Sequence, residues 1–526
     1  MPWTYGFDDA GDSADTPGRD VLGGKGAGLV EMVGMGLSVP PGFVIGTPCG
    51  RAYFDAFPGP ALPEDLDGEL TTRLAALELV TGRRFGDDED PLLVSVRSGA
   101  PVSMPGMMDT VLNVGLTPAG TEKLAARTGD QRFAYTSLER LLDTFARTVR
   151  GVDVGEIEDA LMDLPSEPDP GRAAQARCEA LLKVIEVESG GAFPDAHGQL
   201  RESIEAVFRS WRSRRAKAYR KHKGIDDDMG TAVVVQTMVF GNRDERSGSG
   251  VAFTRDPSTG ARGAFGDFLF RAQGEDVVSG EHDTEPLPVI GDKLPEVYAE
   301  LLSTFETLER HTRDLCDIEF TIESGRLYLL QSRVGQRSGR AAVELAVDLV
   351  DEGLITVDEA VTRVDDEQLA AARAPRFSDD APEDVIARGL AASPGAVTGV
   401  CAFDSDRAQA LKDGGDDVVL LRPTTSPADM PGVIASVGVV TGRGGRTSHA
   451  AVVARGMGRA AVCGVGELTV ARDRRSATLA GRELIEGDLI SVDGDRGVVS
   501  AGRRPTVPAH TDPTLARFLR WKEGER

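Results

Sequence analysis

The sequence predicts a multidomain protein of the α/β and α+β classes, and three observations lead to this prediction. The chain has 526 residues, enough for two to four domains with cores of their own. A β-branched run, 437–441, is followed by a glycine cluster and an Ala/Val-rich segment, the pattern of a strand, a tight loop and a helix. Residues 316–333 alternate apolar and polar side chains, as two paired strands do.

Composition is that of an ordinary globular protein and argues against several functions. The excess of 84 acidic over 59 basic residues gives a net charge of −25, which disfavours binding to nucleic acid or anionic membranes. The 5 cysteines form no CxxC pair, which argues against a zinc site or a disulfide framework. Since the chain begins with polar and acidic residues and has no apolar run of membrane-spanning length, we expect a cytoplasmic protein.

The first motif in chain order is glycine-rich and surrounds a lysine. In VLGGKGAGLVEM, residues 21–32, the glycines allow backbone N–H groups to approach a phosphate, and Lys25 adds a mobile positive charge. The motif is neither a Walker A loop nor a GxGxxG fingerprint. It leaves two interpretations open, a phosphate-binding loop and a structural loop before a helix.

Arg97 is the next candidate, at the expected end of a short strand, residues 92–96. An arginine beside a flexible loop can hold a phosphate with its planar fork of donors, although a surface ion pair is the alternative. The segment SMPGMMDT, residues 103–110, is rich in Met and Gly, which favours a mobile segment that packs over a neighbouring part.

Residues 118–197 are predicted to be helical and acidic, with no chemical motif. A further helix is expected at 201–223, where the apolar stripe has a basic face around it. That face suits a solvated helix surface, and a phosphate or partner site is the alternative. The stripe consists of Ile204, Val207, Phe208 and Trp211.

The paired strands at 316–333 place two carboxylates on one face, because Asp317 and Glu319 alternate with apolar residues. A three-residue loop, 324–326, would put Glu319 directly opposite Gln331. Two acids and an amide oxygen can hold Mg²⁺ together with substrate phosphates. An exposed polar face of a hairpin is the alternative.

The strand, loop and helix at residues 438–458, GVVTGRGGRTSHAAVVARGMG, contain the best candidate nucleophile. Thr447 and Ser448 occupy the expected N-cap, which places His449 in the first helical turn. Helix-start N–H groups favour an anion there, and imidazole can act as a covalent nucleophile. His449 therefore suits a histidine that carries a phosphoryl group; a structural histidine is the alternative.

These motifs resemble, in order, those of the pyruvate phosphate dikinase family, whose relatives include phosphoenolpyruvate synthase and rifampicin phosphotransferase. GGRTSHAAVVARG is similar to the phosphohistidine motif, with Arg446 where the dikinases usually have Met. The resemblance to the nucleotide-binding half runs from Tyr5 to about Arg337, and SVRSGAPVSMPGMMDT and GVAFTRDPSTG are highly specific to it. SPGAVTG and RPTTSPADMPG match the small phosphohistidine domain.

The resemblance implies a fold for each part of the chain. It implies an ATP-grasp nucleotide-binding domain at 1–338 with a helical subdomain at about 118–200, a helical linker or hinge at 339–388, a small swivelling phosphohistidine domain at 389–503, and a tail at 504–526.

The resemblance also implies roles for named residues. Lys25, Arg97 and Arg333 would contact ATP phosphates, while Asp317, Glu319 and Gln331 would surround the metal, with Glu319 and Gln331 as the Mg²⁺ ligands. The β-phosphoryl group of ATP would pass to His449 with release of AMP, and the γ-phosphoryl group to phosphate or water. Thr447 corresponds to the threonine that is phosphorylated in plant dikinases, although a helix cap is the simpler role.

The acceptor of the phosphoryl group is open at this point. Because the chain ends at Arg526, we expect it to lack the α/β barrel that binds pyruvate or phosphoenolpyruvate in the dikinases. Three hypotheses follow: pyruvate is phosphorylated on a separate barrel protein, a specialised small molecule is the acceptor as in rifampicin phosphotransferase, or the chain is a nucleotide-binding regulatory protein without turnover. The presence of His449 argues against the third. A homodimer is left open.

Overall fold

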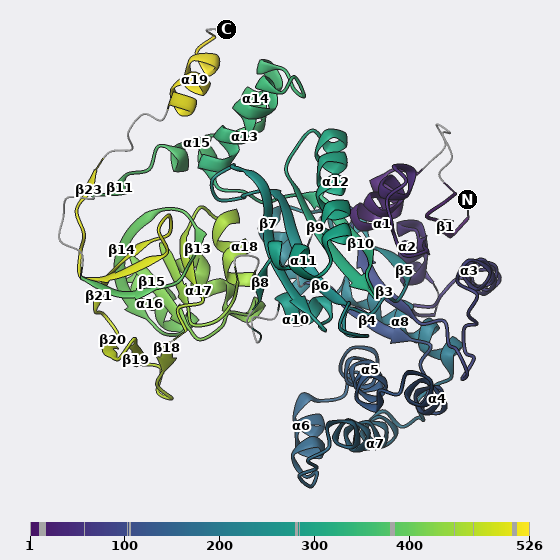
Figure 1. Cartoon of the computed structure of the whole chain (residues 1–526). Helices are drawn as coiled ribbons and strands as arrows, with labels where there is room; N and C mark the ends of the chain where they lie inside the picture. The colour runs from purple at the N-terminus through teal and green to yellow at the C-terminus, as the bar shows by residue number, and fades with distance from the viewer. Residues whose placement is uncertain are drawn as a thin grey trace. The chain divides into compact units, whose positions relative to one another are not determined.

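A computed structural model of the chain describes residues 2–9, 17–56, 58–102, 104, 107–278, 282, 284–378, 384–445, 448–466, 468–507 and 513–524. It shows a mixed α/β protein with several sheets (Figure 1), as predicted. The chain divides into two compact units. Unit 1 comprises Met1–Val239 and Tyr328–Gln331, and unit 2 comprises Phe240–Leu327 and Ser332–Arg526.

Unit 1 is built on an antiparallel sheet of five strands in the order β1-β2-β5-β3-β4. Every residue of β2 and β5 is buried, so these β-branched strands form the centre of the core. Helices α1, α2 and α8 pack on the sheet. The bounds are β1 Thr4–Gly6, β2 Gly42–Ile45, β3 Val94–Gly99, β4 Thr110–Val114, β5 Ala232–Thr237, α1 Arg19–Gly34, α2 Thr47–Asp55, α3 Leu66–Thr81 and α8 Ala196–Ser210.

Between β4 and α8 the chain is helical. Thr117, Asp130, Asp153 and Asp169 each accept a hydrogen bond from a first-turn N–H group, which is why a helix begins after each of them. The helices are α4 Pro118–Thr128, α5 Gln131–Thr144 with a π-helical continuation Phe145–Arg150, α6 Val154–Met162 and α7 Pro170–Ser189.

The single helix predicted at 201–223 is wrong, because two helices are present there. The break follows α8, and Ser213 caps α9, Arg214–Lys223, by accepting from the Ala216 N–H. The predicted apolar stripe is nevertheless buried, since none of its four side chains is more than 2% exposed. Trp211, the last of the four, lies in the break itself.

A second sheet has the order β10-β9-β6-β7-β8, and all of it belongs to unit 2 except Tyr328–Gln331 of β10. Strand β6 pairs antiparallel with both β7 and β9, and all of its residues are buried. Helix α12 packs on β6 and β9. The bounds are β6 Gly248–Arg255, β7 Arg262–Phe270, β8 Glu285–Pro286, β9 Cys316–Glu323, β10 Arg326–Val334, α10 Gly274–Val278, α11 Pro288–Lys293 and α12 Pro295–Thr312.

Four helices of unit 2 share one apolar core, although one of them comes from the end of the chain. Leu515 and Phe518 of α19 are buried among side chains of α13, α14 and α15, and Arg517 of α19 pairs with Asp351 of α13 at 2.7 Å. Strands β11 and β23, which connect these helices to the next sheet, pair antiparallel. The bounds are α13 Gly339–Asp351, α14 Val357–Arg363, α15 Asp366–Ala372, α19 Pro513–Lys522, β11 Arg376–Phe377 and β23 Thr506–Val507.

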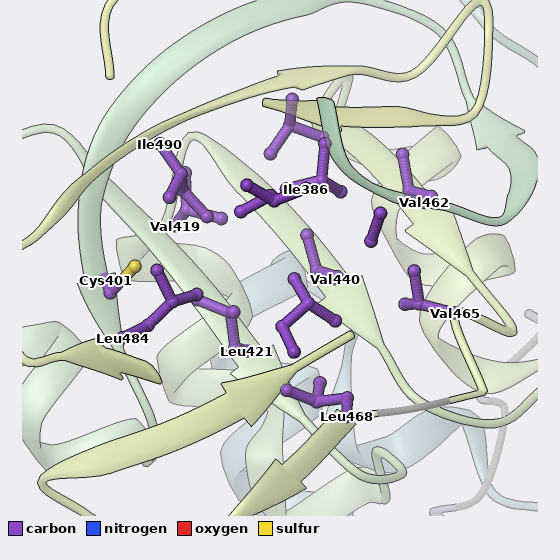
Figure 2. Close-up of a cluster of buried hydrophobic side chains, with 14 of the residues drawn as sticks. Ile386, Cys401, Val419, Leu421, Val440, Val462, Val465, Leu468, Leu484 and Ile490 are labelled. Carbon is purple, nitrogen blue, oxygen red and sulfur yellow. The ribbon is translucent and has the colours of Figure 1, made fainter. Parts of the chain in front are cut away.

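Unit 2 also has a sheet of eight strands in the order β12-β22-β21-β14-β15-β16-β17-β13, and a small sheet in the order β18-β19-β20, with bounds Leu468–Val470, Ser476–Leu479 and Arg482–Ile485. Strands β14 to β17 are parallel, and helices α16, α17 and α18 connect them. Apolar clusters cover both faces, and Figure 2 shows one of them, with Val419, Leu421 and Val440 at its centre. The bounds are β12 Val385–Arg388, β13 Leu390–Ser393, β14 Ala396–Ala402, β15 Val418–Arg422, β16 Gly438–Thr441, β17 Ala460–Cys463, β21 Leu489–Asp493, β22 Val498–Ala501, α16 Ser405–Asp413, α17 Met430–Ala435 and α18 His449–Gly456.

Two expectations from composition can be compared with this fold. All five cysteines are buried free thiols, in agreement with the absence of a disulfide framework. In the ranges that the structure describes, no helix combines the length and apolar character needed to cross a membrane.

Candidate active site

Lys25 lies inside α1, where the helix is interrupted. Gly23 has a φ of 69°, and a Cβ added there would lie 1.7 Å from the Gly99 carbonyl oxygen, so only glycine fits. The Gly24 N–H donates to the Ala100 carbonyl at 2.9 Å. The predicted glycine loop is therefore a kink within a helix rather than a loop before one, and it brings Lys25 to the end of β3.

Arg97 lies in β3, two residues before the strand ends at Gly99. Its Nη1 donates to the Leu330 carbonyl at 3.2 Å and to the Gln236 Oε1 at 3.5 Å. A Cβ on Gly99 would lie 3.7 Å from the Lys25 Cβ. Two of the predicted phosphate-binding residues, Lys25 and Arg97, therefore lie at the same end of β3 in unit 1. Leu330, whose carbonyl accepts from Arg97, directly precedes Gln331, the third predicted site residue of this unit.

Asp317 and Arg333 form the centre of the second group, in unit 2. The Arg333 Nε donates to Oδ2 of Asp317 at 2.8 Å, and Nη2 lies 2.7 Å from the same oxygen. Burial opposes the charge of Arg333, but the carboxylates of Asp317 and Glu319 outweigh it and raise its pKa. Burial raises the pKa of Asp317, while Arg333 opposes that shift. The guanidinium therefore stays charged beside a carboxylate that is 4% exposed.

The hairpin that carries this pair differs from the prediction at its turn. Ser324 and Gly325 have φ values of 51° and 80° and form a two-residue turn, so the predicted three-residue loop is wrong. At the end of the hairpin away from the turn, however, the Gly335 N–H donates to the Leu315 carbonyl and Arg333 contacts Asp317. Both contacts fit the strand register that the predicted three-residue loop would give. Glu319 belongs to unit 2 and Gln331 to unit 1, so their pairing stays a prediction.

The oxygen atoms of this group suit a magnesium ion. Oδ1 of Asp317 is buried and accepts no hydrogen bond from the residues that the structure describes, and Glu319 lies near enough to influence Asp317 electrostatically. Within the same described ranges, no three His, Cys, Asp or Glu side chains cluster as a complete metal site. Mg²⁺ is commonly held by one or two carboxylates plus substrate phosphates, and this donor set fits that pattern.

His449 is the first residue of α18, as predicted. Ser448 is the N-cap by its backbone angles, and the Val452 N–H donates to its carbonyl. The Ser448 hydroxyl points instead to the Cys463 Sγ at 4.0 Å. Arg446 and Thr447 lie outside the described residues, so the cap role and the modification predicted for Thr447 stay predictions.

The loop before α18 begins at the carboxyl edge of the parallel strands. The Gly442 N–H donates to the Arg422 carbonyl at 3.0 Å and the Arg443 N–H to the Pro423 carbonyl at 2.9 Å. This edge, where strand ends meet helix starts, is where parallel α/β sheets bind ligands. Residue 449 therefore occupies a position suited to chemistry on an anionic group.

One residue near His449 was missed from the sequence. Arg455 of α18 is 2% exposed, its Nη1 donates to the Ala392 carbonyl at 2.5 Å, and burial lowers its pKa to about 10. The signal that could have found it is a charged residue within an otherwise apolar helix, AAVVARG. Such a residue is rarely buried without a specific partner.

Comparisons with known proteins match two regions of the chain to family models. Residues 55–297 match the family model "Pyruvate phosphate dikinase, AMP/ATP-binding domain", and residues 414–497 match "PEP-utilising enzyme, mobile domain". The pyruvate, phosphate dikinase of Clostridium symbiosum is 42% identical over 537 residues, which cover 100% of this chain and 60% of the relative. The enzyme of Rhizobium meliloti is 43% identical, with 100% and 60% covered, and chloroplastic dikinase 1 of Arabidopsis thaliana is 43% identical, with 97% and 54% covered. The chain thus spans little more than half the length of these relatives.

Proposed function

Because the chain belongs to the pyruvate phosphate dikinase family, we propose that it is an ATP-dependent phosphotransferase with a phosphohistidine intermediate on His449. The observation that carries this proposal is the presence of both matched regions in one chain, with a histidine at the start of α18 in the second. The proposed folds are an ATP-grasp nucleotide-binding domain and a swivelling phosphohistidine domain.

The proposed reaction breaks the bond between the α- and β-phosphates of ATP. His449 attacks the β-phosphorus, AMP leaves, and the γ-phosphoryl group passes to phosphate or water, which leaves the β-phosphoryl group on His449. Such a reaction needs from the protein mainly positioning and stabilisation of charge. A helix start supplies N–H groups and a favourable dipole for the phosphorylated side chain.

We propose, from the family resemblance, that six residues bind ATP: Lys25, Arg97, Asp317, Glu319, Gln331 and Arg333. The three cations would offset phosphate charge. Support comes from the placement of Lys25 next to Gly99, at the end of the strand that carries Arg97, and of Arg333 against Asp317. The interrupted helix α1 also presents backbone N–H groups around Lys25.

We propose that Glu319 and Gln331 hold Mg²⁺. When bound, the ion offsets charge on the phosphate oxygens. The buried Oδ1 of Asp317 is a further oxygen atom on the same face of β9, available to coordinate the ion. The role of Asp317 itself is to keep Arg333 oriented through its Oδ2.

For the acceptor we propose pyruvate, bound at a site outside residues 1–526. The support is that the matched relatives are named pyruvate, phosphate dikinases. To test this, the phosphorylated chain would be isolated and mixed with pyruvate, alone and with the isolated barrel domain of a related dikinase. We expect phosphoenolpyruvate only in the second mixture. Release of phosphate without phosphoenolpyruvate in both mixtures would contradict pyruvate as the acceptor.

The first half of the reaction has its own test. The chain would be incubated with Mg²⁺ and γ-labelled ATP, with and without phosphate, and the nucleotides and labelled products separated. We expect about one AMP per chain; label in pyrophosphate would identify phosphate as the γ-phosphoryl acceptor, and label in orthophosphate would identify water. Formation of ADP instead of AMP would overturn the proposed reaction.

A further inference from the structure

Arg455 contacts two different sheets of unit 2 with one side chain. It lies on α18, six residues after His449, and its Nη1 donates to the Ala392 carbonyl in β13 of the eight-stranded sheet. Its Cζ lies 5.6 Å from the ring centroid of Phe253, a residue of β6 in the five-stranded sheet. A nearly buried guanidinium thus spans the junction between these sheets.

The groups that face Arg455 across this junction are acidic. The carboxylates of Asp256, Asp267 and Asp317 all act electrostatically on its guanidinium. Two of them, Asp267 and Asp317, are 6% and 4% exposed, so water screens their charge less than at the surface. Since burial lowers the pKa of Arg455 only to about 10, the guanidinium is charged at neutral pH.

The loop before α18 approaches the same acidic surface. A Cβ added to Gly445 would lie 2.5 Å from Oδ2 of Asp267 and 2.8 Å from Oγ1 of Thr284. At the other end of the helix, a Cβ on Gly456 would lie 3.6 Å from Oε1 of Gln336. Gly445 before α18 and Gly456 at its end therefore both lie close to residues of, or next to, the five-stranded sheet, and Arg455 adds a charged group between them.

Asp317 connects this contact to the proposed ATP site, because it is the β9 partner of Phe253, the residue whose ring lies beside Arg455. Arg333 donates to Oδ2 of Asp317, and Asp317 also acts on Arg455. A phosphate bound to Arg333 would offset part of the charge with which Arg333 neutralises Asp317. Because a nucleoside triphosphate with one bound Mg²⁺ still has a net negative charge, the net negative charge that Arg455 experiences would then increase.

We propose that Arg455 is a positioning residue, which holds α18 at the five-stranded sheet through Asp317 and does so more strongly when nucleotide phosphate occupies Arg333. This inference rests on the proposed function, since it assumes that Arg333 binds phosphate and that the domain carrying His449 moves. Through this contact, the domain that carries His449 would stay at the five-stranded sheet while ATP is bound and separate from the sheet afterwards. Two sites coupled in this way must affect each other reciprocally.

The test measures nucleotide binding rather than turnover. The dissociation constant for α,β-methylene ATP with Mg²⁺, an analogue in which the reacting bond cannot break, would be measured for wild type, Arg455→Met, Arg455→Lys, Asp317→Asn and the double variant Asp317→Asn/Arg455→Met. Arg407→Gln is the matched control, because Arg407 is an arginine of the same sheet region that pairs with Glu486.

We expect Arg455→Met to weaken binding of the analogue about fivefold or more, Arg455→Lys to weaken it less, and Arg407→Gln to leave it unchanged. In the Asp317→Asn background, Arg455→Met should have a smaller further effect than in wild type, because one acidic partner of Arg455 is gone while Asp256 and Asp267 remain. Wild-type affinity in Arg455→Met, or effects that add in the double variant, would overturn the proposal.

A measurement on the wild type keeps the proposal testable if Arg455→Met does not fold. Hydrogen exchange of the α18 amides would be followed with and without the analogue and Mg²⁺. We expect slower exchange with nucleotide, whereas equal exchange would overturn the proposal. Both measurements are independent of whether His449 is phosphorylated, so failure of the proposed reaction would be seen separately, as absence of AMP.

Discussion

Arg333 directs its Nε and Nη2 to a single oxygen of Asp317, Oδ2, at 2.8 and 2.7 Å. The other oxygen, Oδ1, is buried and receives no hydrogen bond from the residues that the structure describes. A buried acceptor left unsatisfied costs about 1–3 kcal/mol. A metal ion or a water bound beside Glu319 would remove this cost, which makes the face of β9 the place where a cation is most needed.

Glu319→Gln tests whether that cation is Mg²⁺. The amide keeps the size of the side chain but removes the negative charge that Mg²⁺ prefers. We expect the Mg²⁺ concentration for half-maximal formation of AMP to rise about tenfold or more, a loss of about 1.4 kcal/mol. Glu323→Gln is the matched control, since Glu323 lies on the same strand but pairs with Arg243 at 3.1 Å. An unchanged Mg²⁺ requirement in Glu319→Gln would remove Glu319 from the metal site.

Gly445→Ala tests the close approach of the loop before α18 to Asp267. The added methyl group would lie 2.5 Å from Oδ2 of Asp267, closer than van der Waals contact allows, so the loop must shift. We expect the rate of AMP formation to fall at least tenfold while the melting temperature changes little. Gly274→Ala is the control, because a Cβ there meets nothing within 4 Å. Equal rates in both variants would show that this approach does not matter for the reaction.

Phe518→Ala tests the anchoring of the C-terminal helix. Phe518 is 0% exposed and lies in the core shared by α13, α14, α15 and α19. Phe→Ala changes at such positions typically cost about 3–5 kcal/mol, and we expect a loss of this size in urea unfolding. Leu79→Ala, at a position that is 86% exposed, should change stability by less than about 0.5 kcal/mol. A small effect of Phe518→Ala would show that α19 is not part of the cooperative fold.

The ion pair between Arg407 and Glu486 predicts how the stability of the fold depends on pH. Arg407 donates from Nε to Oε2 of Glu486 at 2.8 Å, and this hydrogen bond holds the pKa of Glu486 below its ordinary value of 4.5. Because the folded state binds this proton more weakly than the unfolded state, the pair stabilises the fold above the ordinary pKa. The contribution is lost as pH falls through the lowered folded pKa.

We therefore expect Glu486→Gln to be less stable than wild type at pH 7, with the difference disappearing as pH falls below about 4. Urea unfolding of both proteins between pH 3 and pH 7 measures it. A difference that is constant across this range would show that the Glu486 charge has no part in stability.

Local patterns in the sequence predicted the backbone around His449 and the strand that carries Asp317. In both cases the pattern is short: glycines followed by Ser448 define a helix start, and alternation from Asp317 to Ile322 defines a strand face. The turn at Ser324 was predicted one residue too long, because the φ values of both turn residues are positive and hairpin turns of two and three residues share the same glycine signal.

The errors concern features that depend on distant contacts. The break after α8 was missed because Trp211 continues the apolar stripe of that helix, while Ser213 is the only local sign of a new cap. The kink at Gly23 follows from its approach to Gly99, 76 positions later. The packing of α19 on α13 and the acidic surroundings of Arg455 likewise join segments that no window of sequence contains together.

Labelling of the chain from β-labelled ATP tests the central claim most directly. Wild type and His449→Ala would be incubated with Mg²⁺ and β-labelled ATP, and the protein analysed for label that is lost in acid and kept in alkali. We predict about one such label per wild-type chain, located on His449, and none on His449→Ala, while both proteins bind α,β-methylene ATP equally. Equal labelling of His449→Ala, or a wild-type chain that binds the analogue but takes up no label, would contradict the account.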